Sequence, residues 1–158
     1  MPDRAFQEYY PAPFDRCYGC GTANEQGLHV LSRWDGEESV CTYTPGPQHL
    51  AVPGVVYGGL IASLIDCHST GTAAAAAYRA EGRALDTLPA LRFVTASLHV
   101  DYLAPTPLGI PLELRSTVRE IKGRKVVVGT TLTAAGVVCA RGEVVAVRIP
   151  DDFIPPRP

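Results

Sequence analysis

The sequence predicts an α+β domain in which one long apolar helix is wrapped by a curved antiparallel sheet. Three observations predict it: a continuous helical pattern in the middle of the chain, alternating strand patterns after it, and short turns between those strands. The chain has 158 residues, which suits one domain with a single core. We expect an N-terminal arm over residues 1–27, the folded domain over 28–150 and a C-terminal tail over 151–158.

The helical pattern begins near Gly58 and fades after Tyr78, where Gly82 supplies an end signal. It is apolar on nearly all sides and carries five consecutive alanines from Ala73, so we expect it to be buried. Asp66 lies inside this pattern. An acid in a buried helix is costly unless it has a partner or a function.

Six strand patterns flank the helix, two before it and four after it. They cover residues 28–34, 38–44, 92–103, 112–121, 125–134 and 137–149. In the strand over 92–103, the polar face is predicted to carry Thr95, Ser97, His99 and Asp101. Because the connections are mostly short, the strands should form an antiparallel meander around the helix. This element order is that of the hotdog fold, and a β-barrel with one inserted helix is the alternative.

Composition and charge exclude several classes of protein. The net charge is −2, and the one basic cluster, Lys122, Arg124 and Lys125, is too small to follow a nucleic-acid backbone. We find no export signal and no apolar run of membrane-spanning length, so a cytoplasmic protein without nucleic-acid or membrane partners is expected.

Five cysteines make an odd number, which favours free thiols in a reducing compartment. Cys17 and Cys20 form a C-x-x-C pattern that is open to three interpretations: a zinc site, a redox pair or a packed turn. A structural zinc site needs four ligands, and the sequence has no second C-x-x-C or H-x-x-H pair. We therefore favour the packed turn and assign no metal.

Two segments resemble a known family, and a third is similar to it more weakly. Residues 54–66, G-V-V-Y-G-G-L-I-A-S-L-I-D, resemble the G-x-V-H-G-G-x-x-A-x-x-x-D segment of hotdog acyl-CoA thioesterases of the phenylacetate-degradation (PaaI-like) type. Residues 94–105 resemble the family's x-T-A-x-L-x-I-x-Y-x-x-P segment, and Cys17–Leu28 is similar to the Cys/Gly lead-in of several members. The resemblance implies hydrolysis of acyl-CoA thioesters, and we expect no metal or organic cofactor.

The resemblance also implies roles for particular residues. It places the catalytic carboxylate at Asp66, an oxyanion donor at the backbone N–H of Gly59 and a water-orienting hydroxyl at Thr95. Tyr57 stands where many members carry His, and a phenol cannot act as a neutral base near pH 7. His49 or His68 could substitute, although neither position matches and His68 is expected to be a packed or interface histidine.

Several further residues are candidates for contacting the substrate: Tyr57, Gly58, His49, Ser63, Ser97 and Arg124, the last at the phosphates of coenzyme A. Structural alternatives stand beside these roles. Asp66 can be a helix acid whose hydrogen bonds come from Thr70 or neighbouring backbone, and Thr95 can be an ordinary strand residue. The two glycines can be a tight entry to the helix, and the basic turn can be a solvated hairpin.

A distance argument predicts a homodimer, or a dimer of dimers. Gly59 and Asp66 lie two helical turns apart, roughly 10 Å along the axis. Both must reach one carbonyl, so two antiparallel helices should form composite sites, with Gly59 from one chain and Asp66 from the other. Asp66 can act as general base or as nucleophile.

Two other functions remain open at this point. A non-catalytic acyl-CoA-binding domain is favoured by Tyr57 in place of His. The other is a hotdog hydratase or dehydratase. Such an enzyme usually uses a His paired with an acid at its active site, and the hydratase-type G-D-x-N-P-x-H segment is absent from the sequence.

Overall fold

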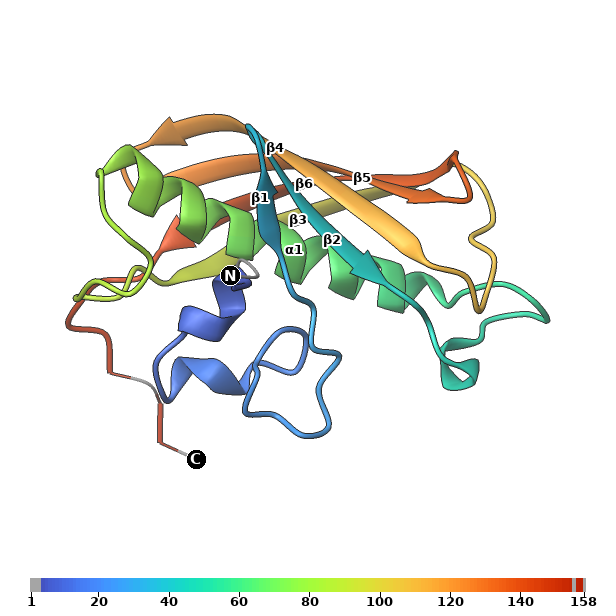
Figure 1. Ribbon diagram of the computed structural model, residues 1–158, viewed down its shortest axis with the longest axis horizontal. Coiled ribbons are helices and arrows are strands. Elements are labelled where there is room, and N and C mark those ends of the chain that lie inside the picture. Colours follow the sequence, from blue (N-terminus) through green and yellow to red (C-terminus); the bar gives the residue numbers. More distant parts are fainter. Residues whose placement is uncertain (1–3, 155, 158) are drawn as a thin grey trace.

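The computed structural model describes residues 4–154 and 156–157, and it has the predicted hotdog arrangement (Figure 1). In chain order the elements are η1 (Phe6–Tyr9), η2 (Phe14–Arg16), β1 (Arg33–Asp35), β2 (Glu38–Tyr43), η3 (Pro47–His49), α1 (Gly58–Ala80), β3 (Phe93–Tyr102), β4 (Leu112–Lys122), β5 (Lys125–Ala134) and β6 (Val137–Arg148). The strands form one sheet in the order β1-β2-β4-β5-β6-β3, and every neighbouring pair is antiparallel. This confirms the predicted fold class.

The helix α1 is enclosed from two sides. The curved sheet lies over one side of α1 and the N-terminal segment lies on the other (Figure 1). This explains why the helix is apolar nearly all round: Leu64, Ile65 and Ala73 are fully buried, and so is the polar His68. In the described part of the chain, no helix has both the length and the apolar character needed to cross a bilayer.

The N-terminal segment is laid directly on α1. Phe6 and Gln7 of η1 are buried, and the Phe6 amide donates to the carbonyl of Ser32 at 2.9 Å. Gly71 of α1 allows this approach, because a Cβ there would lie 2.5 Å from Nε2 of Gln7. Residues predicted as an arm therefore contribute to the core.

The predicted strand over 28–34 is wrong for most of its length, since β1 spans only Arg33–Asp35. His29 has a positive φ of 57°, which breaks an extended backbone. The amides of Leu28 and Val30 donate to the carbonyls of Tyr18 and Gly19, at 2.8 and 2.9 Å. These residues therefore pair with the Cys/Gly turn of the N-terminal segment instead of extending the hairpin with β2.

The predicted polar face of β3 is wrong at Thr95, because a β-bulge interrupts the alternation. The register with β6 shifts between Thr95 and Ser97. Before the bulge, Phe93 packs on the core and Thr95 contacts α1; after it, Val100 and Tyr102 face the core and α1. Thr95 is therefore on the helix side of the strand.

Candidate active site

Asp66 and Thr95 meet between α1 and β3. Asp66 is half-buried, and its Oδ1 accepts a hydrogen bond from the Thr95 hydroxyl at 2.5 Å. The Thr70 hydroxyl donates instead to the backbone carbonyls of Asp66 and Cys67, at 2.9 and 3.3 Å. The carboxylate is thus held by the strand residue that the second family-like segment supplies.

The surroundings of Asp66 favour proton transfer. Burial raises the pKa of its carboxyl above the ordinary value, the hydrogen bond from Thr95 opposes this rise, and the nearby Cys17 sulfur adds to it. A carboxylate with a raised pKa is a stronger base than an exposed one.

The amino end of α1 presents backbone amide groups that lie ahead of the helical hydrogen bonds. The first helical hydrogen bonds are donated by Leu60 and Ile61, both to the carbonyl of Tyr57, so the amides of Gly58 and Gly59 precede the helical ladder. The helix dipole adds positive potential there. This end of the helix can therefore hold an oxyanion.

The side chains of two tyrosines lie at the amino end of α1. A Cβ on Gly59 would lie 2.6 Å from Cζ of Tyr57, so the exposed ring of Tyr57 crosses over this glycine. The Tyr102 hydroxyl donates to the carbonyl of Gly58 at 2.7 Å. A groove of about 410 Å³ opens beside them, and its lining includes Val52, Val55, Val56, Ile61, Leu103 and Pro105. An acyl or pantetheine chain is of the chemistry that such a surface accepts.

The other predicted contact residues are engaged locally. Ser63 donates to the carbonyl of Gly59 at 2.8 Å, and His49 accepts the amide of Gly46 at 2.9 Å while its carbonyl accepts that of Tyr57 at 2.8 Å. Arg124 donates through Nε and Nη2 to the carbonyl of Arg148, at 3.0 and 2.6 Å. Ser97 is exposed on β3 beyond the bulge.

His68 is a packed histidine, as expected. Its Nδ1 lies 2.8 Å from Oγ of Ser32 and its Nε2 lies 3.3 Å from Oγ of Ser39. Burial lowers the pKa of His68 to about 4, so the ring is neutral near pH 7. Fully enclosed between hydroxyls, it is not the base that replaces the missing histidine. His99 is exposed and pairs with Asp101 at 3.2 Å.

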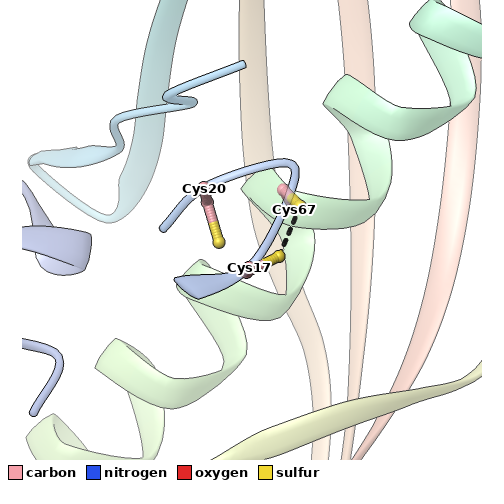
Figure 2. A group of neighbouring side chains, drawn as sticks. All are labelled: Cys17, Cys20 and Cys67. Atoms are coloured by element: carbon pink, nitrogen blue, oxygen red, sulfur yellow. Dashed lines mark hydrogen bonds between the residues drawn. The ribbon is translucent and has the colours of Figure 1, made fainter. Parts of the chain in front are cut away.

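Beside Asp66 the structure brings together three thiols that spacing alone did not group. The Sγ atoms of Cys17, Cys20 and Cys67 all lie within 4.8 Å of one another (Figure 2). Hydrogen bonds from the thiols of Cys20 and Cys67 and from the amides of Cys20 and Gly19 lower the pKa of Cys17 to about 2. Donating to Cys17 raises the pKa of Cys20 to about 12. Cys67 comes from α1, so only the fold reveals it as a third member.

Comparison with known proteins identifies the family. The family model of the thioesterase superfamily matches residues 53–140, more than half of the chain. The chain belongs to the thioesterase superfamily. This matched region contains both family-like segments, with Gly59, Asp66 and Thr95.

Relatives that are acyl-CoA thioesterases support the resemblance. Acyl-coenzyme A thioesterase THEM4 of Xenopus laevis is 40% identical over 87 residues, which are 55% of this chain and 33% of that protein. The Mus musculus THEM4 is 36% identical over 97 residues, which are 61% of this chain and 36% of the relative. The chain thus spans about a third of the length of these relatives.

Solved structures agree with the fold. A thioesterase superfamily protein from Shewanella loihica PV-4 is 50% identical with a TM-score of 0.65, and the match covers 81% of this chain and 97% of that one. The PaaI protein of the E. coli phenylacetic acid degradation operon is 20% identical with a TM-score of 0.63, covering 78% of this chain and 81% of that one. At that identity it supports the fold alone.

Proposed function

We propose that the protein hydrolyses acyl-CoA thioesters to the free acid and coenzyme A. The observation that carries the proposal is the half-buried Asp66 carboxylate, oriented by Thr95, in a chain of the thioesterase superfamily. The THEM4 relatives, which are acyl-coenzyme A thioesterases, support the choice of substrate class.

In the proposed reaction Asp66 acts as general base. Because Thr95 occupies Oδ1, the other carboxylate oxygen takes the proton of a water molecule as its oxygen attacks the thioester carbonyl. The Gly59 N–H of a second chain holds the oxyanion of the tetrahedral intermediate. When the C–S bond breaks, the thiolate of coenzyme A leaves and takes the proton from Asp66. Direct attack by Asp66 to give a mixed anhydride, followed by hydrolysis, is the alternative route.

A second copy of the chain is part of this proposal. Within one straight α1, Gly59 and Asp66 remain roughly 10 Å apart along the axis, too far to act on one carbonyl. β3 is the long edge strand of the sheet, and Val94, Leu98 and Tyr102 on it are exposed. A long exposed edge with apolar side chains favours pairing with another strand. Pairing of two β3 strands across a two-fold axis would place the two helices side by side.

The test is release of free coenzyme A thiol from a panel of acyl-CoAs of different length and aromaticity. We expect wild type to turn over at least one of them and Asp66→Asn to lose at least about 100-fold in kcat/KM. Asp86→Asn makes the same chemical change at an exposed loop position and should behave as wild type. Equal turnover by wild type and Asp66→Asn would remove Asp66 from the mechanism.

One observation favours a second function, binding of acyl-CoA without hydrolysis. The Tyr57 ring crosses over Gly59, where the oxyanion is expected to approach. Equilibrium binding of the same acyl-CoA panel separates the two functions. Saturable binding with no thiol release by wild type would support the binding module and overturn hydrolysis.

A further inference from the structure

The cluster of Cys17, Cys20 and Cys67 has the features of a metal site. Two of its members come from the Cys/Gly turn of the N-terminal segment and the third from the middle of α1. Figure 2 shows their sulfur atoms directed into one shared space. Three thiols from two segments 50 residues apart thus converge, and thiolates are preferred ligands of soft metal ions.

The sulfur–sulfur distances match coordination better than a disulfide. Two thiolates bound at about 2.3 Å to one zinc ion lie about 3.8–4.0 Å apart in tetrahedral or trigonal geometry. The Sγ atoms of Cys17 and Cys67 are 3.9 Å apart, and the whole set lies within 4.8 Å. A disulfide needs about 2.05 Å, so a bond would require a much larger movement than coordination would.

The glycines of the Cys/Gly turn let the thiols come together. Gly19 allows the helix thiol to approach, because a Cβ there would clash with Sγ of Cys67. Gly21 closes the turn by donating to the Cys17 carbonyl at 2.8 Å, and a Cβ on Gly21 would lie 2.5 Å from the carbonyl oxygen of Asp15.

Charge and access are also suitable. Three thiolates and Zn²⁺ carry a net charge of −1, and Cys17 and Cys20 share the wall of a cavity of about 230 Å³ with the buried Arg92. Nε of Arg92 has no hydrogen-bond partner among the described residues, so its guanidinium is able to act as a counter-charge. Cys17 is exposed, which provides an entry path and room for water as the fourth ligand.

We propose that Cys17, Cys20 and Cys67 bind one zinc ion through three thiolates, with the fourth position open to solvent. The sequence argued against zinc because it offered no second pair of ligands, and α1 supplies the third one. The ion would fasten the N-terminal segment to the helix at the residue next to Asp66. This site goes beyond the proposed hydrolysis, and its role is to join two segments.

The test uses the full chain, expressed without a metal-binding tag in zinc-supplemented medium, together with Cys17→Ser and Cys67→Ser. Cys139→Ser is the matched control, because Cys139 is buried outside the cluster and carbonyl acceptors of Val137 and Pro105 lie beside its sulfur. Elemental analysis should give one zinc per chain in wild type and control. Titration of the chelator-treated reduced chain with Co²⁺ should give thiolate-to-metal charge-transfer absorption. Both readings should be lost in Cys67→Ser, and in Cys17→Ser the affinity should fall at least about 100-fold.

Cys17→Ser keeps the test meaningful if Cys67→Ser fails to fold, because Cys17 is exposed. Zinc bound equally by wild type and Cys17→Ser, or Co²⁺ bound without charge-transfer absorption, would overturn the proposal. So would failure of the reduced chain to bind, together with a thiol count under non-reducing conditions that reveals a disulfide within the cluster. Asp66→Asn should bind zinc as wild type does, so loss of hydrolysis and loss of metal are separate results.

Discussion

At the scale of single residues, the hydrogen bond from Thr95 to Asp66 is the contact on which the candidate site depends. It joins β3 to α1 and fixes one oxygen of a half-buried carboxylate. Thr95 does not need to touch the substrate to affect the rate. In the proposed reaction, its hydrogen bond to Oδ1 leaves the other carboxylate oxygen to face the water. The same hydrogen bond lowers the pKa of Asp66, so it stabilises the ionised form.

Replacing Thr95 should therefore shift both rate and pH profile. In Thr95→Val the hydrogen bond that lowers the pKa of Asp66 is gone, so this pKa rises further and Asp66 stays protonated to a higher pH. The acid limb of kcat/KM should move to higher pH and the plateau should fall roughly 10-fold or more. Thr95→Ser keeps the hydroxyl, so the acid limb and the plateau of kcat/KM should both be close to those of wild type. All three proteins are compared after chelator treatment, so that the thiol cluster is in the same state. An unmoved acid limb in Thr95→Val would contradict the positioning role.

At the scale of elements, β3 shows where sequence patterns suffice and where they do not. Its existence follows from alternation of apolar and polar residues, but the bulge between Thr95 and Ser97 reverses which side chains face the helix. Nothing local marks this bulge, because it reflects pairing with β6. The resemblance nevertheless singled out Thr95, since it compared positions and did not depend on a face.

Other elements also separate into those that local sequence signals predict and those that depend on long-range contacts. The sequence predicts the helix over 58–78 and it spans Gly58–Ala80, because its alanines and its closing glycine are local signals. The strand expected over 28–34 failed because the amides of Leu28 and Val30 bond to a turn ten residues earlier in the chain. The grouping of Cys67 with Cys17 also cannot be predicted from local sequence, because it depends on the packing of the N-terminal segment on α1. Long-range contacts were thus the part that the sequence alone could not predict.

The exposed edge of β3 gives an element-scale prediction. Leu98→Lys places a charge in the middle of this edge, where the second copy is proposed to pair, so the protein should become monomeric in sedimentation velocity. Hydrolysis should fall at least about 100-fold although Asp66 and Thr95 are intact, because a monomer lacks the second chain's oxyanion donor. Val137→Lys, at an exposed aliphatic position of β6, should keep both the dimer and the rate. An active monomer of Leu98→Lys would refute the composite site.

At the scale of the whole molecule, the proposed site exists only between two chains. α1 holds Gly59 at its amino end and Asp66 two turns later, and the described contacts of Asp66 lead to β3 and the N-terminal segment instead of that end. Each chain would therefore contribute half of each of two sites. This division can be tested directly, because two inactive variants with substitutions in different halves of the site should complement each other in a mixed dimer.

Mixing Asp66→Asn with Gly59→Pro provides that test. Proline removes the Gly59 N–H at a position where the helix needs no donor, and the exposed Tyr57 ring can move away from the new side chain. Each variant alone should be nearly inactive. After unfolding and refolding together at equal concentrations, about half of the dimers are mixed, and each has one undamaged site, so about a quarter of the wild-type rate should return. If Gly59 and Asp66 of the same chain formed the site, no rate would return.

The opposite control is wild type refolded with an equal amount of the doubly substituted chain. Composite sites predict about a quarter of the rate of the same total amount of wild-type dimer. Single-chain sites predict about half of that rate.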